Sequence, residues 1–267
     1  MSTSTNTRRG FLKLGLCLAL FSALGFATQS PKPKPEGKLE APAKELRVLF
    51  VGNSYCYVND LPKLVVDLGA ADAGAPKIAV ESVTPGGATM KQHWESTGAL
   101  EKIRSGKFTH VVLQGQSLEP VANTEEFLTH ARKLIVEVQN AGAVPVLYQT
   151  WARREGAPEY KRDWSKGSPK RMQTAISAAY DKAAANSKAR IARVGDAWGS
   201  LMEEQGPPAL FDADGSHPSP TGTYLAGCVL YEALTGRRSA ELDVRREGVT
   251  PELARRLRQS VQALATK

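Results

Sequence analysis

The sequence predicts an α/β fold in which a parallel sheet of five short strands is covered by helices on both faces. Short apolar runs bounded by turn residues alternate with longer segments whose apolar residues recur at helical spacing. The runs are apolar at nearly every position, which is typical of parallel strands that are buried on both faces. A length of 267 residues with 42% hydrophobic content suits one such domain with appended segments.

The elements follow one another in a regular order. The predicted strands are residues 46–51, 77–84, 109–113, 143–149 and 190–194. The predicted helices are residues 61–73, 90–105 with an interruption near Gly98, 125–141, 170–186 and 219–234. A final helix starts at Thr250-Pro251-Glu252, because threonine caps helices and proline suits the first helical position. The crossovers between parallel strands should be right-handed.

The first 27 residues have the pattern of an export signal. Arg8-Arg9 resembles the twin-arginine signature, an apolar stretch follows, and Gly25-Phe26-Ala27 is an acceptable cleavage site. A retained membrane anchor is the alternative, but the apolar stretch is shorter than the ~20 residues that a span needs. We therefore expect cleavage and export, to the periplasm or the extracellular space. Residues 28–44 are rich in proline and lysine and are expected to form an extended linker.

Charge and cysteine content restrict the possible partners. Loss of residues 1–27 would remove three of the 35 basic residues and none of the 27 acidic ones, which leaves +5. This balance is mildly basic, and no stripe of basic and aromatic residues predicts nucleic-acid binding. Cys56 and Cys228 would remain, and we expect both to be free, with a disulfide kept open as the alternative. No metal-ligand cluster or phosphate-binding glycine loop stands out, so no cofactor is expected.

Polar residues gather where the predicted strands end. In open α/β sheets, ligands bind beyond the carboxyl ends of the strands, and these ends lie at one edge. They carry Ser54 after the first strand, Gly86-Gly87 after the second, Gln116 after the third and Trp151 after the fourth, with Asp214 and His217 before the helix at 219–234. The sequence therefore predicts one polar site at this edge.

Three of these residues have the chemistry of a nucleophilic triad. A serine hydroxyl at a strand-to-helix turn is a weak nucleophile alone and needs a base. His217 is expected to take the proton of Ser54, and Asp214 to orient the imidazole and stabilise its charged form. The alternative for Asp214 and His217 is an acidic turn that closes on a helix cap at Pro218-Ser219.

These short blocks together resemble the SGNH (GDSL-type) esterase and lipase superfamily, from about residue 45 to residue 236. The matching residues are Gly52-Asn53-Ser54-Tyr55 in the first block, Gly87 in the second, Gln116 in the third, and Asp214 with His217 in the fifth. The first block usually has Asp and the third Asn, so the chain resembles a branch with Asn53 and Gln116 at these places. The resemblance implies a flavodoxin-like, three-layer α/β/α fold. No Gly-x-Ser-x-Gly elbow occurs, which argues against the α/β-hydrolase fold.

The resemblance also implies an oxyanion hole. Its donors would be the backbone N–H groups of Ser54 and Gly87 and the side chain of Gln116. The alternative for Gln116 is a bond to the backbone, with Ser117 or a water in its place. Asn53 is expected to hold the turn.

Further residues are candidates for the wall of the substrate pocket or for packing. Trp151 could stack on a sugar, and His93 could line the pocket, with a packed helix face as its alternative. We expect Cys56 to be a buried thiol rather than a nucleophile. The loop at 152–171 carries seven basic and three acidic residues and is either a lid, a substrate collar or a solvated loop.

The sequence therefore predicts an exported serine esterase of short acyl groups, and we expect these to be O-acetyl groups on carbohydrate. Residues 45–240 would form the hydrolase domain and 241–267 a C-terminal helical extension. An acyltransferase with the same machinery, or a non-catalytic glycan-binding module, are the alternatives.

Overall fold

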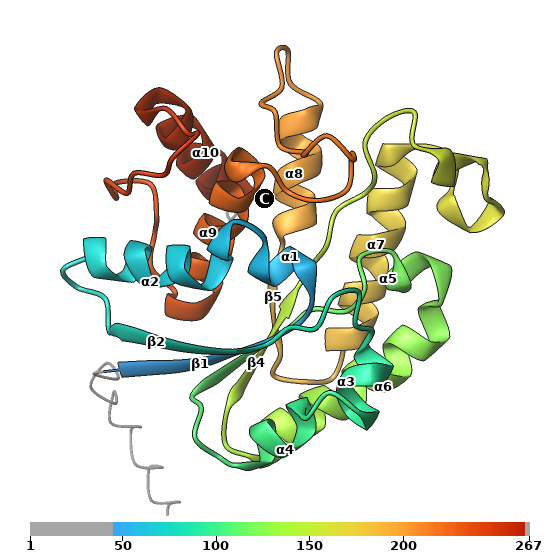
Figure 1. Cartoon of the computed structure of the whole chain (residues 1–267), viewed down its shortest axis with the longest axis vertical. Coiled ribbons are helices and arrows are strands. Elements are labelled where there is room, and N and C mark those ends of the chain that lie inside the picture. The colour runs from blue at the N-terminus through green and yellow to red at the C-terminus, as the bar shows by residue number, and fades with distance from the viewer. Residues whose placement is uncertain (1–44, 265–267) are drawn as a thin grey trace, which may run out of the picture. The chain divides into compact units, whose positions relative to one another are not determined.

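The computed structural model describes residues 45–264, and the predicted signal (1–27) and linker (28–44) lie outside the described residues. All strand pairs of the single sheet are parallel, and their order is β2-β1-β3-β4-β5 (Figure 1). The strands are β1 (Glu45–Val51), β2 (Lys77–Val83), β3 (His110–Leu113), β4 (Val144–Tyr148) and β5 (Arg190–Ala192). The predicted fold class is confirmed.

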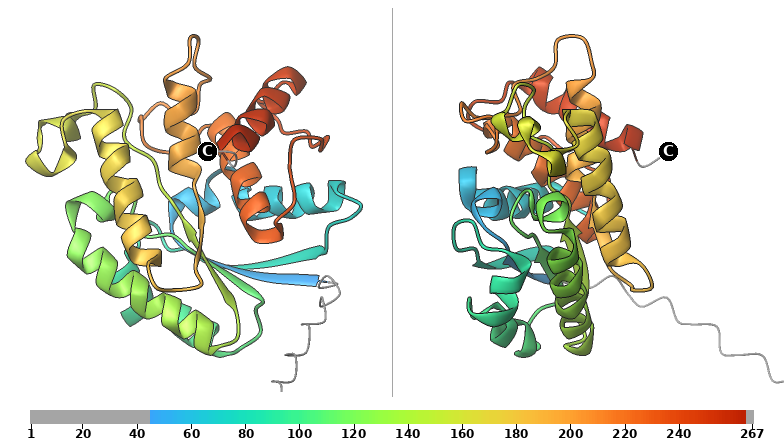
Figure 2. Two further views of the ribbon diagram at one scale, coloured as in Figure 1. Left: turned by 180° about the vertical axis from the view of Figure 1, so that it is seen from behind. Right: turned by 90° about the vertical axis from the view of Figure 1, so that its right-hand side faces the viewer.

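Helices cover both faces of the sheet (Figures 1 and 2). One face carries α2 (Leu61–Ala71), α8 (Val194–Met202), α9 (Pro220–Thr235) and α10 (Pro251–Leu264). The other face carries α3 (Met90–Glu95), α4 (Ala99–Arg104), α5 (Glu119–Ala122), α6 (Thr124–Asn140) and α7 (Pro169–Ala184). Each face has its own hydrophobic core, so the sheet separates two apolar layers.

The central strand shows why the runs are apolar at every position. Val48 and Phe50 of β1 belong to the core on the α9 face, and Leu49 and Val51 belong to the core on the α6 face. Successive side chains of a strand point to opposite faces, so a strand covered on both sides needs apolar residues throughout. The chain places β2 on one side of β1 and β3 on the other. Open α/β sheets bind ligands at the carboxyl ends of the strands beside such a switch point, which here lies between β1 and β3.

Two of the differences from the predicted helices have local reasons. The segment 90–105 forms two helices, because Gly98 adopts a left-handed φ of 78° at the start of α4. Helix α8 was not predicted, since its glycines weaken the helical pattern. A Cβ at Gly195 would lie 2.0 Å from the carbonyl oxygen of Thr150, so this glycine permits α8 to pack against the end of β4.

The C-terminal segment packs on the same core as α9. Leu257 and Val261 of α10 are buried there, and Thr250 accepts a hydrogen bond from the Leu253 N–H, as the capping pattern predicts. Cys56 and Cys228 are buried and free. Among residues 45–264, none of the helices has the length and hydropathy that a membrane span requires.

Candidate active site

Ser54 lies at the carboxyl end of β1 and is the first residue of the short helix α1 (Ser54–Tyr57). Asn53 caps this helix, and its side-chain oxygen accepts a hydrogen bond from the Tyr55 N–H at 3.2 Å. Ser54 is half-buried, while Asn53 and Tyr55 on either side are buried. The strand-to-helix turn therefore presents the Ser54 hydroxyl at the edge of the sheet.

Asn53 also joins the first three loops of this edge. Its amide nitrogen donates to the carbonyl oxygens of Ala88 at 3.0 Å and Gly115 at 3.1 Å. Its backbone N–H donates to the side-chain oxygen of Gln114 at 3.0 Å. An aspartate has no N–H to donate, so these two carbonyl contacts account physically for asparagine at this place. Asn53 holds the turn, as the sequence predicts.

Asp214, His217 and Ser54 are hydrogen-bonded in series. The Asp214 carboxylate lies 2.5 Å from Nδ1 of His217, and Nε2 of His217 lies 2.9 Å from Oγ of Ser54. A carboxylate only accepts hydrogen bonds, so Nδ1 carries the hydrogen and Nε2 is left to accept one from the serine hydroxyl. The structure thus brings the three predicted residues together in the order that proton transfer requires.

The Asp214 carboxylate is held in its ionised form. Its second oxygen accepts hydrogen bonds from the backbone N–H groups of Ser216 at 2.8 Å and His217 at 2.9 Å. Desolvation opposes ionisation, but the hydrogen bonds from the His217 ring and from these two N–H groups outweigh it and lower the pKa of Asp214 to about 2. Asp214 therefore stays negative at any working pH and can stabilise a charged imidazole.

The structure corrects the prediction that Trp151 lines the substrate pocket. Trp151 is 0% exposed, and its ring stacks 4.4 Å from Tyr55 on one side and 4.0 Å from Trp198 on the other. No face of the indole is left for a sugar. Its Nε1–H donates to the carbonyl oxygen of Ser216 at 3.0 Å, so Trp151 supports the loop that carries His217.

His93 is likewise a packing residue rather than part of the pocket wall. It is 0% exposed on α3, and its Nδ1 lies 3.0 Å from the hydroxyl of Thr97. Burial lowers the pKa of His93 to about 4, so the ring is neutral near pH 7. The structure therefore shows the alternative stated from the sequence, in which His93 lies on a packed helix face.

The stack around Trp151 gives a first prediction. Trp151→Ala should lower the free energy of unfolding by about 3–5 kcal/mol, because it removes a fully buried ring and leaves a cavity. It should also slow any reaction at Ser54, since the Ser216 carbonyl loses one of its two donors, Trp151 Nε1–H, and keeps only the Tyr55 hydroxyl. Urea denaturation measures the first effect. Trp94→Ala is the control, because Trp94 is only half-buried on α3; an equal loss in both variants would contradict a supporting role for the stack.

Gln116 uses its two side-chain ends differently. Its oxygen accepts hydrogen bonds from the N–H groups of Leu118 at 2.8 Å and Glu119 at 3.1 Å, so it caps α5. Its amide nitrogen donates to the Ser117 hydroxyl at 3.2 Å. The second hydrogen on that nitrogen has no partner within the part of the chain that the structure describes. The alternative stated from the sequence, that Gln116 bonds to the backbone, therefore applies to its side-chain oxygen only. One N–H of its side-chain amide remains available as a donor.

Sequence reasoning missed Arg153, which lies at the start of the basic loop. Arg153 is 8% exposed, and its guanidinium donates to the Tyr55 hydroxyl at 2.8 Å, the Ser117 hydroxyl at 3.0 Å and the Glu159 carboxylate at 3.0 Å. Tyr55 in turn donates to the carbonyl oxygen of Ser216 at 2.8 Å. Arg153 thus links the first, third and fifth blocks. In the sequence it is one of seven basic residues, and nothing there marks it as buried.

Glu119 was also missed, although its spacing to Gln116 is that of a capping box. It is 2% exposed at the start of α5 and accepts hydrogen bonds from the N–H groups of Met90 and Gln116. Burial raises the pKa of Glu119 to about 7, against the effect of these two hydrogen bonds and with a smaller contribution from Glu126.

This pKa predicts how stability depends on pH. The folded protein holds the Glu119 proton up to about pH 7, whereas the unfolded chain releases it near the ordinary value of 4.5. The stability that Glu119 contributes is therefore greatest below pH 4.5 and is lost as the pH rises to 7. Relative to Glu119→Gln, which does not titrate, the wild type should lose up to about 3 kcal/mol across this range. Urea denaturation from pH 4.5 to 8 measures it; parallel curves would contradict the prediction.

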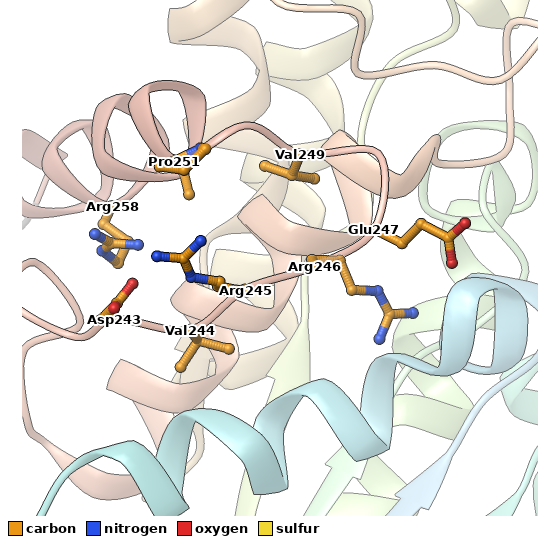
Figure 3. Close-up of a pocket in the computed structure, with 9 residues that line it drawn as sticks. Asp243, Val244, Arg245, Arg246, Glu247, Val249, Pro251 and Arg258 are labelled. Atoms are coloured by element: carbon orange, nitrogen blue, oxygen red, sulfur yellow. The ribbon is translucent and has the colours of Figure 1, made fainter.

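Two hollows lie away from Ser54. A groove of about 840 Å³ runs between α7 and α8, and Arg154 on its wall donates to the carbonyl oxygen of Ala213 in the loop that leads to His217. A smaller cleft of about 270 Å³ lies on the C-terminal segment, where Arg245 and Arg258 flank Asp243 (Figure 3). Neither lining includes a triad residue. Among residues 45–264, no three His, Cys, Asp or Glu side chains are grouped to hold a metal ion.

Comparison with known proteins places this chain in a family. No protein-family model and no curated sequence matches it. Among solved structures, a protein from Slackia heliotrinireducens that is assigned to the SGNH hydrolases is 30% identical, with a TM-score of 0.59, and the match covers 71% of this chain and 98% of that one. At this identity over nearly the whole relative, the chain belongs to the SGNH hydrolases and is a hydrolase of that type.

Two more distant structures share the fold. A DUF4886 family protein from Bacteroides uniformis is 19% identical with a TM-score of 0.69, and the match covers 83% of this chain and 95% of that one. A catalytic mutant of Axe2, an acetylxylan esterase from Geobacillus stearothermophilus, is 15% identical with a TM-score of 0.55, over 75% of this chain and 97% of that one. At these identities the likeness concerns the fold.

Proposed function

We propose that this hydrolase cleaves esters of short acyl groups, with Ser54 as nucleophile, His217 as general base and Asp214 as the residue that orients His217. The observation that carries the proposal is the unbroken hydrogen-bonded series from Asp214 through His217 to Ser54. It lies at the carboxyl end of β1, beside the switch point where open α/β sheets bind their ligands.

The reaction follows the geometry. His217 Nε2 takes the proton from Ser54 Oγ as this oxygen attacks the ester carbonyl carbon. The charged imidazole, stabilised by Asp214, then gives the proton to the leaving alcohol oxygen, and the acyl group remains on Ser54. A water molecule attacks the acyl-enzyme with His217 again as base. The acid leaves, and Ser54 recovers its proton.

Three donors can bind the oxyanion that forms in each step. The backbone N–H groups of Ser54 and Gly87 have no hydrogen-bond partner among residues 45–264. Ser54 is the first residue of a helix, where N–H groups are left unpaired, and Gly87 has a left-handed φ of 69° that favours glycine. The second amide hydrogen of Gln116 would be the third donor. Fixed donors of this kind stabilise a developing negative charge strongly.

The acyl group would be acetyl and the alcohol a carbohydrate hydroxyl. The support is the predicted export of the chain and the shared fold with Axe2, which is an acetylxylan esterase. The test is hydrolysis of p-nitrophenyl acetate, butyrate and octanoate, followed by acetylated xylo-oligosaccharides. Acetate should be the best of the three aryl esters. A preference for octanoate would overturn the short-acyl assignment, and acetylated acceptor sugars among the products would indicate acyl transfer instead of hydrolysis.

Export by the twin-arginine route is proposed from Arg8-Arg9 and the apolar stretch that follows. Replacing both arginines with lysine should leave the precursor in the cytoplasm, because this route reads the arginine pair. Cell fractionation of the wild type and the variant measures the outcome. A single change of Lys13 to Arg serves as a control that leaves the pair intact. Unaltered export of the double-lysine variant would contradict the proposal.

A further inference from the structure

A buried carboxyl group other than that of Asp214 connects the two loops that carry the proposed oxyanion donors. One oxygen of Glu119 accepts hydrogen bonds from the Met90 N–H and the Gln116 N–H, both at 3.1 Å. The other oxygen accepts from Met90 at 3.3 Å. Met90 begins α3, three residues after Gly87, and Gln116 is the residue with the free amide hydrogen. The carboxylate therefore lies between the second and third blocks.

The surroundings of Glu119 are fitted to this carboxylate. A Cβ at Gly115 would lie 2.4 Å from the Glu119 oxygen, so a larger residue there would displace the Glu119 carboxyl group from this place. Gln116 returns the contact, because its side-chain oxygen accepts a hydrogen bond from the Glu119 N–H at 3.1 Å. This reciprocal pair fixes both the backbone and the side-chain amide of Gln116.

Glu119 in its ionised form is costly for folding in this position. It is 2% exposed, and no Lys, Arg or His among residues 45–264 forms an ion pair with it. Buried acids without a counter-charge lose solvation free energy, and such residues gather at functional sites. Asn53 already joins the same loops through the carbonyl groups of Ala88 and Gly115, whereas Glu119 joins them through N–H groups. Asn53 therefore holds the two loops as a hydrogen-bond donor, and Glu119 holds them as an acceptor.

We propose that Glu119 is a positioning residue for the oxyanion hole, which fixes the spacing between the Gly87 backbone N–H and the Gln116 side-chain N–H. It acts through these donors and does not touch the substrate. The inference rests on the proposed ester hydrolysis, because the two donors matter only where an oxyanion forms. A displacement of about 1 Å at such a site is enough to lower a rate by about 10²-fold.

Two substitutions separate the hydrogen bonds from the charge. Glu119→Gln keeps one carbonyl oxygen, which can accept both 3.1 Å hydrogen bonds, so kcat should stay within about 3-fold of the wild type. Glu119→Ala keeps no acceptor and should lower kcat by about 10- to 100-fold with little change in KM. If Glu119→Ala does not fold, Glu119→Met fills a similar volume without an oxygen and should lower kcat in the same way. Equal kcat in Ala or Met variants and in the wild type would overturn the inference.

A double-mutant cycle shows whether Glu119 acts through Gln116. In the Gln116→Ala background, Glu119→Ala should have a much smaller further effect on kcat, since the donor it orients is already absent. Effects that multiply in full would place the action of Glu119 elsewhere and overturn the inference. Glu126→Ala is the matched control, because Glu126 is an exposed acid that pairs with Lys91 beside α3. It should leave kcat and KM unchanged.

Hydrogen exchange distinguishes failure of this inference from failure of the proposed function. If the wild type hydrolyses no ester, the proposed function fails, and exchange of the Met90 and Gln116 amide hydrogens still tests the contact. Both should exchange faster in Glu119→Ala than in Glu119→Gln and the wild type. Exchange that is unchanged in Glu119→Ala overturns the inference whatever the activity. If the wild type hydrolyses esters and Glu119→Ala is fully active, the inference is overturned and the proposed function stands.

Discussion

Ser54→Ala should abolish ester hydrolysis, with kcat lower by about 10⁴–10⁶-fold and the fold intact. The substitution removes the oxygen that we propose attacks the substrate, and His217 then has no proton to accept from it. Ser54 is half-buried, and its side chain makes one hydrogen bond, to His217, so the free energy of unfolding should change by no more than about 1 kcal/mol.

A fluorophosphonate probe followed by peptide mapping identifies the nucleophile directly. Labelling should occur at Ser54 in the wild type and be absent in Ser54→Ala. Ser216→Ala is the control for a neighbouring serine. The Ser216 hydroxyl lies 2.9 Å from the hydroxyl of Tyr55, and the variant that lacks it should keep both labelling and turnover. Cys56 should not react, since burial raises the pKa of its thiol to about 12. Labelling at Cys56 or Ser216 would contradict the assignment of Ser54.

The local patterns of the sequence were sufficient for the sheet and for the contacts among Ser54, Asp214 and His217. Strands buried on both faces need continuous apolar runs, and because the strands are parallel, all the loops that follow them lie at one edge of the sheet. The pair Asp214 and His217 lies in one tight loop, so its contact is local in sequence. Ser54 joins them because its strand ends at the same edge.

What the sequence could not show depends on where the chain turns after a strand. Trp151 lies three residues after the end of β4, yet the backbone carries its ring inward, between Tyr55 and Trp198. Arg153, two residues later, is buried by contacts to Tyr55 and Ser117, which are far away in the sequence. Only tertiary structure separates these residues from a pocket wall and a solvated loop. Helix α8 was missed for a related reason, since Gly195 permits a close contact with Thr150 that the sequence alone does not show.

Gln116→Glu should lower kcat by about 10²–10³-fold, equivalent to roughly 2.7–4 kcal/mol of transition-state stabilisation, with little change in KM. The glutamate keeps an oxygen that can accept from the Leu118 and Glu119 N–H groups, so the cap of α5 is preserved. It replaces the free amide hydrogen with a negative charge that repels the oxyanion.

Gln116→Ala separates the two roles of this side chain. It loses both the donor and the cap, so kcat should fall as in Gln116→Glu, and the free energy of unfolding should fall by a further ~1 kcal/mol. Steady-state kinetics and urea denaturation on both variants measure the two effects independently. If Gln116→Glu keeps near-normal kcat while Gln116→Ala unfolds, then Gln116 serves only to cap α5. The oxyanion would in that case be bound by the backbone N–H groups of Ser54 and Gly87 alone, and the charge placed at Gln116 would lie too far from the reacting carbonyl to affect it.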